Sequence, residues 1–238
     1  MYDEDYLRLF AVPFAEDPRS DADAELIWGL AGPRPGTRVL DLACGHGRIA
    51  NRLAARGCEV TGLDSSAVFL ERARADAEEL GVEVDYVAGD LRELPWTDRF
   101  DLVVNWATAF GYFDDDVNRD VLRQVRRALR PGGQLVMDLN NLVARLRGYQ
   151  PSHVEAHGSG DLRVDRFHLE PLTNRLEVER TIVRDGSART LSFVVRLFGF
   201  PEIRDWLLAA GFTAVAGHGE DGAPLAAEHD RMVLHART

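Results

Sequence analysis

One stretch of this sequence, Thr37–Ala50, joins an apolar strand pattern to a glycine turn and then to a helical pattern. Val39-Leu40 and Leu42 predict a buried strand, which runs directly into Cys44-Gly45-His46-Gly47. Glycines let the backbone turn tightly and let a ligand come close to it. Asp41 stands where a purely apolar strand would carry another aliphatic residue, so we expect its carboxylate to face a positive or hydroxyl-bearing ligand.

The glycine turn by itself leaves the cofactor open. Gly45–Ala50 fits G-x-G-x-x-A, the dinucleotide fingerprint. Asp64 then follows at about the 20-residue spacing of the acidic residue that binds the ribose in that fingerprint. The turn therefore predicts a nucleotide-type site, and other parts of the chain must identify the ligand.

Composition bounds the kind of protein. A chain of 238 residues with 45% hydrophobic and 28% charged residues can form one large α/β domain. Its net charge of −11 argues against a nucleic-acid partner, which needs basic patches. The acidic start MYDEDYLRLF has no signal-peptide pattern, and no apolar run reaches the roughly 18 residues of a membrane span. Two cysteines, Cys44 and Cys58, do not suggest a disulfide framework, so we expect a cytoplasmic protein without a membrane partner.

Strands alternate with helices along most of the chain, which predicts a parallel α/β sheet with right-handed crossovers. The expected later strands are Glu59–Asp64, Val82–Ala88, Phe100–Val104, Gln134–Leu139, Thr213–Ala216 and Met232–Ala236. The expected helices are Ser20–Leu30 with Ser20 as its cap, Arg48–Arg56, Ser66–Leu80, Asp116–Leu129 and Pro201–Ala210.

The pattern changes between the fifth and sixth core strands. Three strands, Leu162–Leu169, Arg175–Arg184 and Arg189–Phe198, predict an inserted antiparallel sheet. We therefore expect one domain over 1–238. Its parts are an N-terminal helical cap (1–36), a cofactor-binding core (37–140), an inserted sheet or lid (150–200) and the completion of the core sheet (201–238). In the cap, Tyr2, Tyr6, Phe10 and Phe14 form an aromatic stripe at helical spacing, which either packs on the body or closes over a ligand.

Four blocks occur together in order: Val39–Gly47, Gly62-Leu63-Asp64, Ala88-Gly89-Asp90 and Leu129-Arg130-Pro131-Gly132-Gly133. Together they resemble the class I S-adenosylmethionine-dependent methyltransferases. Dehydrogenases with a similar turn usually lack the equivalent of Asp41 and the Arg-Pro-Gly-Gly turn. The resemblance implies a Rossmann-like seven-stranded sheet of order 3-2-1-4-5-7-6, with the last strand antiparallel. It also implies S-adenosylmethionine as cofactor and S-adenosylhomocysteine as product.

The resemblance assigns roles along the strand ends. Asp41 is expected near the cofactor's ammonium group, Asp64 at the ribose hydroxyls, and Asp90 with the Leu91 amide at the adenine. The alternatives are a solvated strand end for Asp64 and a capping role for Asp90. The residues expected at the cofactor are Tyr6, Asp41, Ala43, Cys44, Gly45, Gly47, Asp64, Ser65, Asp90, Leu91, Asn105 and Trp106. His46 replaces the more common threonine or serine, and Arg48 either reaches a cofactor carboxylate or is solvated.

The acceptor side is less specific. Phe110 and Tyr112, after the fourth strand, either wall an apolar acceptor pocket or pack in the core. Arg196 lies in an apolar strand and needs a partner, which is either a substrate anion or an internal carboxylate. His153 and Tyr112 are our candidate catalytic residues, and an exposed lid loop is the alternative for the segment around His153. His153-Val154-Glu155-Ala156-His157 also resembles a metal-binding pattern, but it lacks His-Glu-x-x-His order, and we expect no metal.

These observations predict a methyltransferase that acts on N or O of a small-molecule acceptor, as in enzymes of natural-product pathways. A homodimer formed through the β insertion is expected from the same resemblance. A protein or RNA methyltransferase is the alternative enzyme. A cofactor-binding regulatory or assembly subunit without turnover is the alternative of another class. The sequence names neither the acceptor nor a general base.

Overall fold

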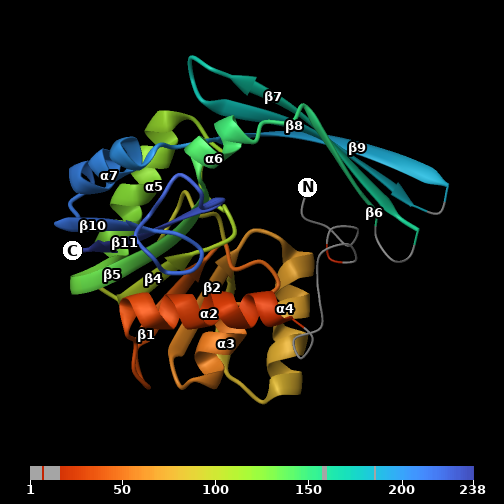
Figure 1. Cartoon of the computed structure of the whole chain (residues 1–238). Coiled ribbons are helices and arrows are strands. Elements are labelled where there is room, and N and C mark those ends of the chain that lie inside the picture. The colour runs from red at the N-terminus through yellow and green to blue at the C-terminus, as the bar shows by residue number, and fades with distance from the viewer. Residues whose placement is uncertain (1–6, 8–16, 157–159, 185) are drawn as a thin grey trace.

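The structure is a computed structural model and describes residues 7, 17–156, 160–184 and 186–238. Its central sheet consists of β1 (Arg38–Leu42), β2 (Glu59–Asp64), β3 (Val84–Ala88), β4 (Phe100–Asn105), β5 (Leu129–Asn140), β10 (Ala214–His218) and β11 (Arg231–Arg237). The strand order is β3-β2-β1-β4-β5-β11-β10 (Figure 1). β11 is antiparallel to both of its neighbours, and the strands from β3 to β5 are parallel. Counted among the core strands alone, this is the predicted order 3-2-1-4-5-7-6, which is confirmed.

Helices cover both faces of this sheet (Figure 1). One face carries α2 (Pro18–Ala31), α3 (Ala50–Ala55) and α4 (Ala67–Leu80), and the other carries α5 (Asp115–Ala128) and α7 (Phe200–Ala209). The alternation along β1 explains the two layers, because Leu40 and Leu42 pack with α5 and α7 while Val39 packs with α2 and α3. The sheet is thus buried on both faces, and ligands are expected beyond the carboxyl ends of its strands.

A second, four-stranded antiparallel sheet follows β5 after the short helix α6 (Leu142–Arg147). Its strands are β6 (Ser152–Ala156), β7 (Leu162–Glu170), β8 (Arg175–Arg184) and β9 (Ser187–Arg196), paired in that order. Figure 1 shows this sheet reaching out from the core beside α6. Leu176, Val178 and Val195 on its inner face pack around Tyr112, which follows β4. The insertion therefore faces the end of the core sheet where a ligand is expected.

Several boundaries differ from the sequence-based expectations. α2 begins at Pro18, two residues before the expected start at Ser20. Its N-terminal cap is Asp17, whose side chain accepts the Ser20 N–H at 3.1 Å, so Ser20 is not the cap. β5 begins at Leu129, five residues before the expected Gln134, since the Pro131-Gly132-Gly133 segment stays in the strand and shifts its register against β4. The segment around His153 is a strand, not the loop we considered. It is an exposed edge strand, so burial gives its sequence no alternating pattern.

The aromatic stripe Tyr2, Tyr6, Phe10 and Phe14 lies outside the described residues, as does His157. The described helices include none with the length and apolarity needed to cross a bilayer.

Candidate functional site

The turn after β1 depends on glycine. Gly45 and Gly47 have φ of +57° and +79°, a left-handed conformation that glycine adopts without strain. A Cβ added to Gly47 would lie 2.2 Å from the Tyr86 hydroxyl oxygen. The preceding Ala43 also has a positive φ, of 58°. The backbone is therefore bent sharply here, and the absent side chains leave room above it.

A pocket of about 420 Å³ opens over this turn at the carboxyl ends of β1, β2 and β4. We call it the glycine-turn pocket. Of the residues predicted at the cofactor, it is lined by Asp41, Ala43, Cys44, Gly45, Asp64, Ser65, Asp90, Leu91 and Trp106. His46, Arg48 and Phe69 also contribute to its wall. Burial lowers the pKa of His46 to about 4, so the imidazole is neutral near pH 7.

Asp41 is the most unusual group in this pocket. Its side chain is buried, and its Oδ2 has no hydrogen-bond partner within the described part of the chain. Burial raises the pKa of Asp41 to about 7, and the nearby Arg48 only partly opposes this. A buried carboxylate oxygen without a partner is costly, so its presence at a pocket wall fits a cationic ligand group such as an ammonium.

Asp64, at the end of β2, has its two oxygens fixed by the backbone. Oδ2 accepts the Gly45 N–H at 2.8 Å, and Oδ1 accepts the Ser66 N–H at 2.8 Å. Burial raises the pKa of Asp64 even though these N–H groups stabilise its charge. Because each carboxylate oxygen has two lone pairs, the same carboxylate keeps capacity to accept from a ligand hydroxyl as well.

Asp90, after β3, is held by its neighbour Arg92. The guanidinium donates to both oxygens at 2.6–3.0 Å, and these hydrogen bonds lower the pKa of Asp90. The Asp90 side chain also accepts the Arg92 N–H, as in a turn cap. The local pairing and a ligand contact are compatible, because Asp90, Leu91 and Arg92 all line the pocket.

Three residues predicted at the cofactor are not among those lining the pocket. Asn105 is 1% exposed and donates from Nδ2 to the Leu42 carbonyl at 2.9 Å, which ties β4 to β1, while its Oδ1 has no hydrogen-bond partner in the described chain. Gly47 is part of the turn, and the Tyr86 hydroxyl packs against it where a Cβ would otherwise lie. Tyr6 lies outside the described residues. A contact between Asn105 and the cofactor stays a prediction.

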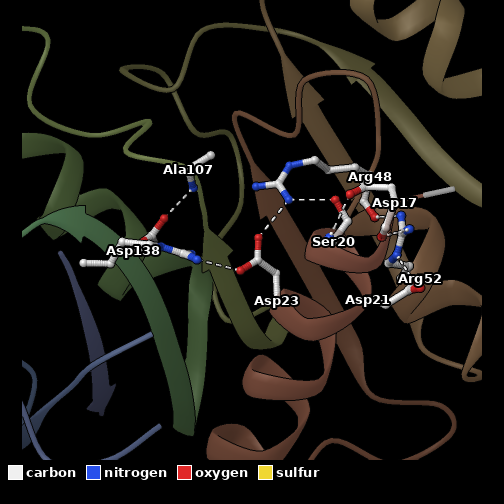
Figure 2. A network of polar contacts seen from close by, with 9 residues as sticks. Asp17, Ser20, Asp21, Asp23, Arg48, Arg52, Ala107 and Asp138 are labelled. Atoms are coloured by element: carbon white, nitrogen blue, oxygen red, sulfur yellow. Dashed lines mark hydrogen bonds and ion pairs between the residues drawn. The ribbon is translucent and has the colours of Figure 1, made fainter. Parts of the chain in front are cut away.

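An ionic network, drawn in Figure 2, shares Arg48 and Ala107 with the wall of the glycine-turn pocket. Asp23 of α2 accepts from Arg48 at 2.9 Å and from Arg231 of β11 at 2.7 Å. Arg231 also donates to Asp138 of β5 at 2.9 Å, and Asp138 in turn accepts the Ala107 N–H at 3.0 Å. The network thereby connects three distant parts of the chain to the backbone that follows β4.

This network supports a strained turn. Ala107 and Thr108 have φ of 60° and 57°, which non-glycine residues rarely adopt in succession. The Asp138 carboxylate holds the first N–H, and its carbonyl holds the second, at 3.2 Å. Burial raises the pKa of Asp138, and Arg231 opposes that shift. The arrangement fixes the wall behind Trp106.

A second pocket, of about 520 Å³, lies between the inserted sheet and this wall. We call it the inserted-sheet pocket. Ala107 and Tyr112 line both pockets, so the two spaces meet at these residues. His153 lies on the wall of the second pocket. Among our candidates for the acceptor side, Tyr112 and His153 are therefore on pocket walls.

The other two candidates for the acceptor side, Phe110 and Arg196, line neither pocket. Phe110 is 2% exposed and packs on Phe198 with ring centroids 5.7 Å apart, so it belongs to the core. Arg196 is 7% exposed and pairs with Glu202 and with Asp115. Its partner is an internal carboxylate, which was one of the two alternatives, and it lines neither pocket.

Sequence reasoning missed the polar group on the inner face of the inserted sheet. Asp165 is 2% exposed and accepts from Arg180 at 2.7 and 3.1 Å, while Arg163 lies 3.2 Å from it. All three line the inserted-sheet pocket. The alternation of β7 carried a signal, because Arg163 and Asp165 share a face with Phe167. In the described part of the chain, no three His, Cys, Asp or Glu side chains are grouped as metal ligands.

Residues 39–133 match the sequence model of a family described as a methyltransferase domain. A ubiquinone biosynthesis O-methyltransferase from Chelativorans sp. is 31% identical over 139 residues, which cover 58% of this chain and 50% of that protein. The chain spans about half the length of the first curated relatives it matches.

Solved structures resemble the whole chain. The methyltransferase CcbJ from Streptomyces caelestis has a TM-score of 0.78 at 24% identity, covering 98% of this chain and 95% of that one. S-adenosylmethionine-bound CalS10 from Micromonospora echinaspora, an amino pentose methyltransferase, has a TM-score of 0.69 at 21% identity and covers 100% and 98%. At these identities the likeness shows the fold, inserted sheet included. Residues 39–133 thus match a methyltransferase domain, and the whole chain has the fold of solved S-adenosylmethionine-dependent methyltransferases.

Proposed function

We propose that this chain transfers a methyl group from S-adenosylmethionine to a nitrogen or oxygen atom of a small molecule bound in the inserted-sheet pocket. One observation carries the proposal: the glycine-turn pocket and the inserted-sheet pocket meet at Ala107 and Tyr112. A methyl donor in the first and an acceptor in the second would have their reacting ends at this junction. Alignment of this kind supplies much of the rate in a direct displacement.

The donor pocket suits the cofactor of the family. In this proposal Asp41 binds the ammonium group, Asp64 the ribose hydroxyls and Asp90 the adenine amino group. When bound, S-adenosylmethionine supplies an electrophilic methyl group on a sulfonium. The pocket's three aspartates exceed its two arginines, which fits a ligand with two positive groups and one carboxylate.

On the acceptor side, Tyr112 orients the acceptor at the junction. Its ring lies 6.1 Å from that of Phe193, so the inserted sheet and the turn after β4 hold it together. His153 lies on β6, the edge strand of the insertion, and contacts the acceptor at a greater distance from the junction. Named relatives act in ubiquinone biosynthesis and on an amino pentose, and these names support a small-molecule acceptor without identifying it.

The first test is calorimetric titration with S-adenosylhomocysteine and, separately, NADH. We expect micromolar binding of S-adenosylhomocysteine alone. Binding of NADH alone would refute the proposal and restore the dinucleotide interpretation of the glycine turn.

Mass-spectrometric screening of metabolite acceptors then tests transfer. Tyr112→Phe or His153→Ala should reduce turnover with cofactor affinity unchanged; if neither variant affects an identified acceptor, these two roles are wrong. Tight cofactor binding with no product across diverse acceptors would favour a regulatory or assembly subunit.

Pairing of two chains through the inserted sheet stays a prediction. β6 is the outer strand of that sheet, and light scattering after size-exclusion chromatography would measure the mass directly.

A further inference from the structure

The inner face of the inserted sheet is apolar at one end of its strands and carries charged side chains at the other end. Register places Phe167, Val178 and Phe193 in one row, and Leu169, Leu176 and Val195 in the next row toward Tyr112. Both rows are apolar. They form the part of the inserted-sheet pocket nearest the junction with the glycine-turn pocket.

The opposite end of the same face is charged. His153, Asp165 and Arg180 form one row, which continues to Leu191. Glu155 and Arg163 form the row beyond it, which continues to Ile182 and Arg189. Arg180 and Arg163 both bond Asp165, and Arg163 also bonds Glu155. These ion pairs fix the two guanidiniums at the pocket wall, where both side chains are 16% exposed.

The two ends are separated by a definite length. From Leu169 to Asp165 is four residues along β7, or about 13 Å at the rise of a strand. A ligand that reaches both ends is therefore elongated, with an apolar middle.

The charge of this pocket is opposite in sign to that of the rest of the chain. Its wall carries Arg145, Arg163 and Arg180 against the single carboxylate of Asp165, an excess of two positive charges. Including Glu155, which pairs with Arg163 from beside the wall, one positive charge still remains in excess, and it is that of Arg145 on α6, which lies outside the ion-paired rows. The whole chain has a net charge of −11, and the glycine-turn pocket has one more aspartate than arginine.

We infer that the acceptor carries an oxyanion, a carboxylate or a phosphate, at the end remote from the methylated atom. Arg163 and Arg180 bind this group in the charged row, while the apolar rows hold the body and direct the other end to Tyr112. A guanidinium has five N–H donors in a planar fork, so it can bond a protein carboxylate and a ligand oxyanion together. The inference rests on the proposed function and names its substrate class.

The test uses the whole chain saturated with S-adenosylhomocysteine, so that cofactor binding is established before any acceptor is added. The probes are aryl alkanoates of increasing chain length, their neutral amides and the matching phosphate monoesters, titrated to 10 mM by calorimetry. We expect a carboxylate or phosphate series to bind at least tenfold more tightly than the amides, with the tightest binding at an intermediate length. The better of the two series identifies the oxyanion.

The variant is the double change Arg163→Gln with Glu155→Gln, which removes an ion pair without leaving either charge alone. It should weaken the anionic probe at least tenfold and leave the amide unchanged. Arg166→Gln with Glu179→Gln is the matched control, because that ion pair joins the same strands β7 and β8 on the opposite face. The control should change neither probe.

A second variant, Asp165→Asn with Arg180→Gln, repeats the test one row closer to the junction. Equal or weaker binding of the anionic probes relative to the amides, or no binding of them to 10 mM, would overturn the inference. That result would leave the proposed methyl transfer standing, whereas failure to bind S-adenosylhomocysteine would remove the proposed function itself.

Discussion

Replacing Asp41 by asparagine should make the cofactor-free protein more stable and a poorer cofactor binder. Ionised Asp41 is unfavourable in the free protein because its carboxylate is buried and Oδ2 has no partner in the described chain. Asparagine keeps the shape and removes the charge. The ammonium of the cofactor would no longer meet a carboxylate.

The size of the stability effect follows from the pKa. Burial raises the pKa of Asp41 from 3.8 to about 7. At about 1.4 kcal/mol per pKa unit, ionisation of this group costs roughly 4 kcal/mol of stability above pH 7. The amide N–H donors of asparagine also need partners, so we expect a net gain of about 1–4 kcal/mol at pH 8. For a chain of this size each kcal/mol raises Tm by about 2–4 °C.

The sign of the pH dependence is specific. Between about pH 4 and 7 the folded protein binds the Asp41 proton and the unfolded chain does not, so this group makes stability fall as pH rises. The gain from Asp41→Asn should therefore be largest at pH 7–8 and shrink as the pH falls to 4. Thermal unfolding and urea denaturation at several pH values measure it.

Binding supplies the other half of the test. S-adenosylhomocysteine should bind Asp41→Asn about 10- to 100-fold more weakly, the scale of a lost hydrogen bond to a charged group. Asp138→Asn is the control, since Asp138 is also buried with a raised pKa but has Arg231 and the Ala107 N–H as partners. Asp138→Asn should lower stability. A loss of stability in Asp41→Asn, or unchanged cofactor affinity, would refute the reasoning.

Three further changes test other parts of the site. Gly47→Ala should destabilise the fold by about 2 kcal/mol or more in urea denaturation, because a Cβ would meet the Tyr86 hydroxyl and φ is +79°; a neutral result would show that the turn can adjust. Asp23→Ala should cost about 3–5 kcal/mol by the same measurement, since it leaves Arg231 and Arg48 without their shared carboxylate; a loss below 1 kcal/mol would mean that solvent replaces the pair. Asp64→Ala should weaken S-adenosylhomocysteine by about 1–3 kcal/mol in calorimetry, and an unchanged dissociation constant would remove Asp64 from the ribose.

Local signals in the sequence were sufficient to predict the strands and helices of the core. The four sequence blocks predicted the strand order through the family resemblance, and the expected helix Ser66–Leu80 corresponds to α4. The glycines at 45 and 47 predicted a sharp turn, because such a turn needs a positive φ. Asp41 predicted a ligand contact, because it is a charged residue in an apolar strand. These features depend on residues close together in the chain, which is why the sequence contains them.

The inserted sheet was predicted less completely than the core. Its strands β7 to β9 were visible as alternating patterns, but β6 was not, because an exposed edge strand has no buried side to create a pattern. Phe110 and Arg196 were plausible pocket residues by type, and their contacts with Phe198 and Glu202 place them in the interior instead.

What the sequence by itself determined is the order of the elements, the glycine turn and the aspartates at three successive strand ends. What only the tertiary structure decided is which polar residues meet. Asp138 lies 93 positions from Arg231, and Asp23 lies 208 positions from it, yet the three form one network. The meeting of the two pockets at Ala107 and Tyr112 is likewise a result of packing. A sequence records each residue's chemistry, whereas the distances between remote residues are fixed only when the sheet and its insertion assemble.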